Sequence, residues 1–130
     1  MEAVAVIVAA AAGFAGGAAW YMGLGARWMA AAGVKAGADG RPEGRSPLPF
    51  VVAGVCMLLL AGLMRHMMAS AGLDGPGTGI TVGASIGAFA IAPWLAMNYA
   101  YARRPRALWL IDGGYAVVGP ALIGLVLGLF

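Results

Sequence analysis

Charged residues are scarce in this chain. Only 10% of its 130 residues are charged, whereas about a quarter is usual for a soluble domain. Hydrophobic residues make up 62% of the sequence, more than a water-exposed surface of this size tolerates. The composition therefore predicts an integral membrane protein. Four spans of about 20 residues each would use most of the chain, so we expect a single transmembrane domain over residues 1–130.

Cysteine and histidine are nearly absent, and this limits the chemistry available. The only cysteine, Cys56, excludes a disulfide within the chain. With no paired carboxylates and no second histidine, we find no catalytic constellation and expect neither enzyme activity nor a cofactor. The only histidine, His66, lies beside Met64 and Met68, which makes a weak candidate for a metal site. Methionine commonly fills apolar helices and the neighbouring Arg65 repels cations, so no metal is the expectation.

Long apolar runs are what the sequence has in abundance. They cover approximately residues 3–24, 48–69, 78–101 and 107–130. At ~1.5 Å per residue, about 22 helical residues reach ~33 Å, enough to cross a hydrocarbon core of ~30 Å. These runs predict an all-α fold, a four-helix transmembrane bundle with a loop over residues 25–47. Within that loop, Ala26–Ala32 is interpreted as a short interfacial helix that Trp28 anchors.

The basic residues are distributed unevenly. Seven of the eight fall in two of the three connections, and by the positive-inside rule these connections are cytoplasmic, with both termini on the outer, periplasmic side. This predicts a multi-pass protein of an inner (cytoplasmic) membrane. Arg65, near the outer end of the second span, is the exception. The basic residues suit anionic lipid headgroups, so the lipid bilayer rather than nucleic acid is the expected partner. The seven are Arg27, Lys35, Arg41, Arg45, Arg103, Arg104 and Arg106.

Glycines recur at four-residue spacing within the spans, which places them on one helix face and lets neighbouring backbones approach closely. Packing within the bundle is the favoured interpretation, and a seam between copies of the chain is the alternative. Pro93 and Pro120 lie inside the third and fourth spans, where each can kink its helix. The spaced glycines are Gly13, Gly17, Gly79, Gly83, Gly87, Gly124 and Gly128.

One polar cluster is predicted inside the apolar zone. Asn98 and Asp112 lie at similar depth on consecutive antiparallel helices, and Tyr115 shares the helix face of Asp112. Trp20 and Tyr21 close the first span at the same boundary. An acid within the membrane needs a partner, and the candidates are Arg103, Arg104 and Arg106. The cluster is interpreted either as a structural clamp between the last two helices, which is favoured, or as a substrate or proton site.

A family resemblance rests on short aromatic and glycine motifs spread over almost the whole chain. The sequence resembles the DUF1761 family of small bacterial membrane proteins of unknown function. The resemblance implies four helices and matches Trp20, Tyr21, Trp28, Asn98 and Asp112 to recurrent positions of the family, but it implies no reaction. The motifs are Trp20-Tyr21, Gly25, Trp28, Gly33, Asn98 with the basic turn after it, and Ile111-Asp112-Gly113-Gly114-Tyr115.

Two functional hypotheses follow from these features. The leading one is a binding or structural subunit, or a helper, of a membrane assembly, which associates either with itself or with another membrane protein. The alternative is a small transporter or channel with a polar site around Asp112 and Asn98.

Overall fold

The computed structural model describes residues 2–130 and is built from helices. Between Pro76 and Tyr101, two α-helices and a π-helical turn form one continuous span, so four helices are long and apolar enough to cross a membrane. The described residues contain no strand. The predicted all-α transmembrane fold is confirmed, and the chain is a multi-pass membrane protein. The elements are α1 (Glu2–Ala32), α2 (Leu48–Ala71), α3 (Pro76–Ile86), η1 (Gly87–Ile91), α4 (Ala92–Tyr101) and α5 (Arg106–Leu127).

The first helix is longer than the sequence predicts. It continues without a break to Ala32, so the predicted end at residue 24 and the separate interfacial helix over Ala26–Ala32 are wrong. The physical reason is that this segment consists of good helix formers, and no strong breaker occurs before Gly33, which ends the helix with a positive φ of 74°. The loop therefore begins at Gly33. At ~1.5 Å per residue, the 31 residues of α1 extend ~46 Å and exceed the hydrocarbon thickness.

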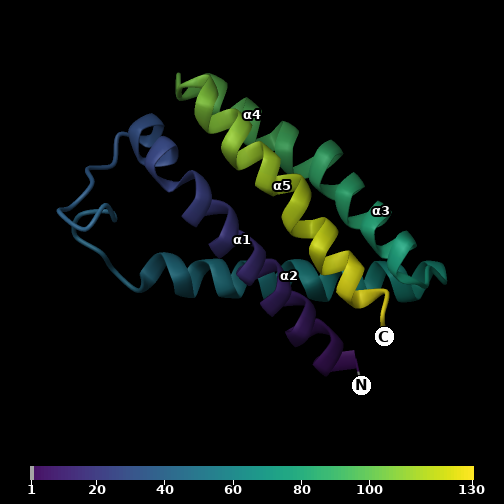
Figure 1. Ribbon diagram of the computed structural model, residues 1–130. Coiled ribbons are helices and arrows are strands. Elements are labelled where there is room, and N and C mark those ends of the chain that lie inside the picture. Colours follow the sequence, from purple (N-terminus) through teal and green to yellow (C-terminus); the bar gives the residue numbers. More distant parts are fainter. Residues whose placement is uncertain (1) are drawn as a thin grey trace.

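Helix α5 lies at the centre of the arrangement. It packs against α3 and α4 on one side and against α1 on the other, while α2 crosses α1 obliquely (Figure 1). Both termini and the turn between α2 and α3 lie at one end, which we call the terminal end (Figure 1). The loop over residues 33–47 and the turn over residues 102–105 lie at the opposite end, which we call the loop end.

The apolar core lies toward the terminal end. There α2 presents Met64 and Met68, both almost fully buried, to small residues of α1 and to the last two turns of α5. An ion pair between Arg65 of α2 and Glu2 of α1 joins the same two helices. This pair gives the one exceptional basic residue a partner. The core residues are Ala5, Ala9, Ala10, Ala61, Met64, Met68, Ile123 and Leu127.

The third span is in backbone contact with α5 at three positions, two in α3 and one at the start of η1. A Cβ atom added to Gly79, Gly83 or Gly87 would overlap the backbone of α5, at Gly124, Pro120 and Ala116 respectively. Dispersion forces grow with such close contact, and they are available inside a bilayer, where the hydrophobic effect between helices is not.

The remaining spaced glycines also face their own chain. Gly13 of α1 lies against Ile123, and Gly17 lies against the Tyr115 ring. A Cβ atom added to Gly17 would lie 2.6 Å from the Tyr115 hydroxyl oxygen. Gly128 lies against Gly75 at the turn before α3. All seven glycines therefore meet a neighbouring segment of the same molecule, which is the interpretation favoured from the sequence, and they do not form an outward-facing seam.

A single π-helical turn interrupts the third span. The amide of Ala92 donates to the carbonyl of Gly87, five residues back, instead of four. Pro93 follows at once and has no N–H to continue the α-helical ladder. Such π turns insert one extra residue into a helix. The residues after η1 are therefore rotated relative to those before it.

The backbone contact between α3 and α5 makes Gly83→Ala a direct test of the fold. The added methyl group meets the Pro120 carbonyl and has no room to shift. Overpacking of this kind costs about 1 to 3 kcal/mol, which we expect to measure as a lower thermal unfolding temperature in mild detergent. Gly54→Ala in α2 is the matched control, because nothing lies within 4 Å of its added Cβ. Equal stability of the two variants would contradict the contact.

Candidate functional site

Among the described residues, Asp112 is the one acidic residue that is buried, with 8% of its surface exposed. It lies six residues after the start of α5, which places it ~9 Å along the helix from the loop end. Two hydroxyl groups and one indole surround its carboxylate. Tyr21 Oη donates to Oδ1 over 2.6 Å, Tyr99 Oη donates to Oδ2 over 2.6 Å, and Trp28 Nε1 donates to Oδ1 over 3.1 Å.

Three helices supply these groups. Tyr21 and Trp28 are seven residues apart on α1, and two helical turns therefore bring them to the same face. Tyr99 comes from α4 and Asp112 from α5. The rings of Tyr21 and Trp28 meet edge to face with centroids 6.2 Å apart. We call these four residues the Asp112 cluster. It ties α1, α4 and α5 together near the loop end, opposite the apolar core.

The predicted arginine partners do not reach Asp112. Within residues 2–130 the ion pairs are Arg45 with Asp39 and Arg65 with Glu2, so pairing of Asp112 with Arg103, Arg104 or Arg106 is wrong. Instead, Arg104 donates to the carbonyl of Ala32 over 2.8 Å. The last carbonyls of a helix lack partners within it, and α1 ends at Ala32. The arginine therefore caps α1 and leaves the carboxylate to neutral donors.

Asn98 does not face Asp112 either, and that prediction is also wrong. Its amide donates to the Trp94 carbonyl one turn back in the same helix, and its side chain is exposed. The cause is η1: an α-helix turns ~100° per residue, so one inserted residue brings Tyr99 to about the position that Asn98 would otherwise occupy. The π turn thereby replaces an amide with a phenol at the cluster.

Trp20 and Tyr115 flank the cluster without contacting the carboxylate. Trp20 Nε1 donates to the carbonyl of Ile111 over 3.0 Å. Tyr115 Oη donates to the carbonyl of Gly13 over 2.6 Å, and its ring meets that of Tyr21 with centroids 5.5 Å apart. Both residues fasten α1 to α5. Of the four residues predicted to surround Asp112, Tyr21 is the one that the structure brings into hydrogen-bonding contact with it.

The weak metal candidate is not assembled. Met64 and Met68 point into the apolar core, whereas His66 is exposed on another face of α2. Side chains two residues apart on a helix do not share a face. Among residues 2–130, no three His, Cys, Asp or Glu side chains gather closely enough to hold a metal ion.

Sequence reasoning missed Tyr99 and gave Trp28 a different role. Hydropathy ends the first span before Trp28 and so assigns this residue to the membrane interface, whereas α1 continues past it. A regular helix directs Asn98 and not Tyr99 toward Asp112, so the sequence pattern alone does not indicate Tyr99. The sequence contains one indication of the π turn, which is Gly87 followed six residues later by Pro93. Proline removes a hydrogen bond of the helix and favours such irregular turns.

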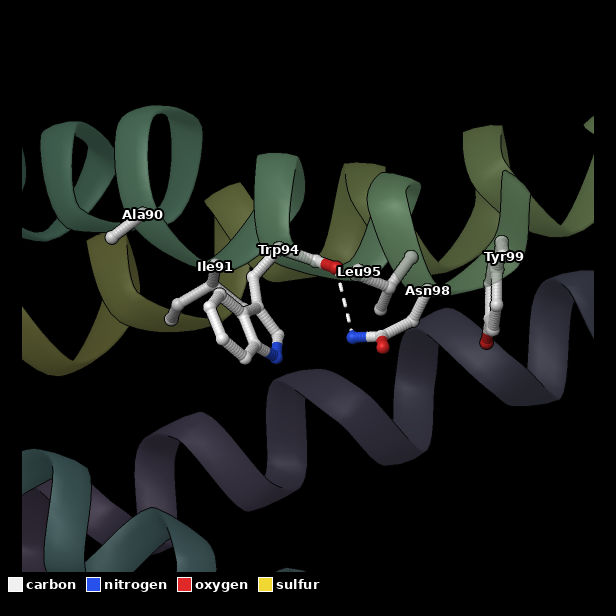
Figure 2. Close-up of a pocket in the computed structure, with 6 residues that line it drawn as sticks. All are labelled: Ala90, Ile91, Trp94, Leu95, Asn98 and Tyr99. Carbon is white, nitrogen blue, oxygen red and sulfur yellow. Dashed lines mark hydrogen bonds between the residues drawn. The ribbon is translucent and has the colours of Figure 1, made fainter. Parts of the chain in front are cut away.

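A shallow groove of about 520 Å³ adjoins the Asp112 cluster. Figure 2 shows its lining residues projecting from one side of α4 and η1 toward α1, with Tyr99 at the loop-end limit. Trp94 is 68% exposed there. The lining is almost entirely apolar, and it consists of Ala90, Ile91, Trp94, Leu95, Asn98 and Tyr99.

The Asp112 cluster satisfies the hydrogen-bonding capacity of the carboxylate but provides no positive charge beside it. An ionised carboxylate only accepts hydrogen bonds, and three donors satisfy it well. None of the three carries a positive charge, so the negative charge is held in place without being neutralised. Acids at such positions in membrane proteins mark either structural polar contacts or ligand and proton sites.

The fold and this cluster define a small four-helix membrane protein with a buried acid near the loop end of its bundle. The chain belongs to the DUF1761 family: the model of that family, described as a protein of unknown function, matches residues 4–128. The resemblance predicted from the aromatic and glycine motifs is confirmed. Neither a curated protein nor a solved structure matches the chain.

The Asp112 cluster should contribute measurably to stability. Asp112→Ala leaves three partly buried donors without their acceptor, and each such loss costs about 1 to 3 kcal/mol. We therefore expect a loss of at least about 2 kcal/mol in detergent unfolding experiments. Asp112→Asn keeps one carbonyl acceptor and should fall between the wild type and Asp112→Ala.

Matched variants separate this effect from general damage. Tyr99→Phe removes one donor and should cost about 1 kcal/mol, whereas Tyr101→Phe, two residues away and 88% exposed, should be neutral. Asp74→Ala changes an exposed acid in the turn after α2. If Asp112→Ala unfolds no more readily than Asp74→Ala, the cluster has no stabilising role.

Proposed function

We propose that the protein acts by binding another transmembrane helix, as a subunit or helper of a membrane assembly. The observation that carries this proposal is the outer face of α1, which points away from α5. Its exposed residues follow a spacing of four and three, the spacing that two packed helices share. They are Val4, Val8, Ala11, Ala15, Ala18 and Met22. We call this set the α1 outer face.

The side chains of this face differ from those of α2. At the middle of α1 the exposed positions are alanines, which let a second helix approach closely. The exposed positions of α2 are large, and they include Phe50, Val55, Leu59 and Leu63. Large apolar side chains suit lipid tails. The contrast favours lipid around α2 and a helix, either from another membrane protein or from a second copy, against α1.

The Asp112 cluster supports the same proposal. It fixes the loop-end half of α1 to α4 and α5, and the apolar core fixes the other half. The α1 outer face is therefore held in one orientation. A rigid face binds with less loss of conformational freedom than a mobile one.

Cross-linking in native membranes tests this association. With Cys56→Ala as background, a photo-reactive residue at position 15 should give a discrete adduct, because the partner helix lies within its reach. The same residue at position 59, on the large-residue face of α2, should react with lipid and give none. Ala15→Phe should abolish the adduct formed from position 18. A detergent-solubilised protein that is strictly monomeric and forms no adduct from either helix would overturn the proposal.

We also propose that the loop end faces the cytoplasm of a bacterial cell, with the protein in the inner membrane. Seven basic residues lie at or near that end, and Arg65 is paired with Glu2 at the other.

Cysteine labelling tests the orientation. In the Cys56→Ala background, a membrane-impermeant maleimide applied to spheroplasts should label Asp74→Cys directly. Ala38→Cys in the loop should be labelled only after permeabilisation. The reverse pattern would mean that the chain is inserted the other way round.

A second candidate function is transport of a small solute through a site at Asp112. The absence of a cationic partner within the described part of the chain favours it, because an uncompensated buried acid is suited to a charged ligand. Asn98 is no part of that site, since it bonds its own helix.

A further inference from the structure

We propose that the Asp112 cluster and the adjoining groove form a binding site for a lipophilic organic cation, such as a quaternary ammonium or phosphonium ion or a protonated hydrophobic amine. The inference names a ligand class for the second candidate function. It does not require the α1 outer face, and it concerns binding whether or not the ligand is moved across the membrane.

The first argument is charge. Asp112 is 8% exposed, and within residues 2–130 no Lys, Arg or His nitrogen lies within 4.0 Å of its carboxylate. Burying an unpaired charge is costly, and a ligand cation would recover much of that cost by pairing with it. A basic side chain in the same place would have removed the attraction.

The second argument is the nature of the donors. Tyr21, Trp28 and Tyr99 bring three aromatic rings to the carboxylate, and the first two meet edge to face. Aromatic rings attract cations through their electron-rich faces, and several rings together recognise quaternary ammonium groups that cannot donate hydrogen bonds. A small metal ion such as Ca²⁺ would need six or more oxygen ligands, whereas this cluster offers one carboxylate and two phenol oxygens.

The third argument is the groove. Tyr99 lines the groove (Figure 2) and also donates a hydrogen bond to Asp112, so the apolar lining continues to a side chain that contacts the acid. Trp94 and Leu95 lie farther along it and offer apolar contact to hydrophobic substituents. An anionic end beside an apolar surface is complementary to a ligand with a cationic centre and apolar groups. The Tyr99 hydroxyl would move from Oδ2 as the cation approaches.

Saturable binding of tritiated tetraphenylphosphonium to the full chain in nanodiscs of zwitterionic lipid tests this inference. We expect about one site per chain. Asp112→Asn should weaken binding at least tenfold because it removes the charge. Trp94→Ala should weaken it severalfold, and this variant leaves the Asp112 cluster untouched. Tyr99→Phe keeps the ring and removes the competing hydroxyl, so it should bind at least as tightly as the wild type.

The controls address charge and location. Tetraphenylborate has the same shape and the opposite charge, and it should not compete. Glu2→Gln and Asp74→Asn change acids at the terminal end and should leave binding unchanged. Absence of saturable binding overturns the inference, and so does equal binding by the wild type, Asp112→Asn and Trp94→Ala.

Flux measurements separate binding from transport. In liposomes loaded with tetraphenylphosphonium, release that depends on the protein and is lost in Asp112→Asn would support both the site and the second candidate function. Binding in nanodiscs without such release would leave the site established and exclude transport of this cation. Neither result depends on cross-linking from α1, so the association proposed above is tested independently.

Discussion

The backbone contact between α3 and α5 is the constraint on which the other helix positions depend. Gly79, Gly83 and Gly87 bring the two helices so close that no side chain separates them at these three positions. Helix α5 is thereby held by α3 on one side and presents Ile123, Tyr115 and Asp112 to α1 on the other. Lipid provides no hydrophobic drive for this association. Instead, the small residues allow close backbone contact, and the dispersion attraction across that contact holds the helices together.

The two ends of the bundle are held by different forces. Near the termini, methionine and alanine side chains pack around α2, and Glu2 pairs with Arg65. Near the loops, α2 has diverged, and hydrogen bonds to Asp112 hold α1 against α4 and α5. The polar contacts thus occur where the apolar packing has ended. Hydrogen bonds to the buried acid thus take the place of apolar packing between helices at this end of the bundle.

Hydropathy and helix length sufficed to predict the four spans, because the cost of exposing backbone groups to lipid leaves few alternatives. The glycine spacing predicted close packing within the bundle, because small residues let backbones approach, but it did not indicate that α3 and α5 would be the pair in contact. The end of α1 was missed because a hydropathy window stops at the bilayer, whereas a helix stops at a breaker, here Gly33. The partners of Asp112 were only partly predictable: Tyr21 followed from depth, but Tyr99 depended on the π turn, which no periodicity rule contains.

The π turn also affects how relatives of this protein should be compared. Its extra residue changes rotation along the helix while leaving the composition of the span nearly unchanged. A family member with the same number of residues but a regular α-helix between Gly87 and Ile91 would align without a gap and keep its hydropathy profile. The residue aligned with Tyr99 would nevertheless point elsewhere, and the one beside it would reach the acid. Equivalent residues in this family therefore have to be assigned by the side of the third span that faces α5. The position in a sequence alignment alone does not identify which side chain meets Asp112.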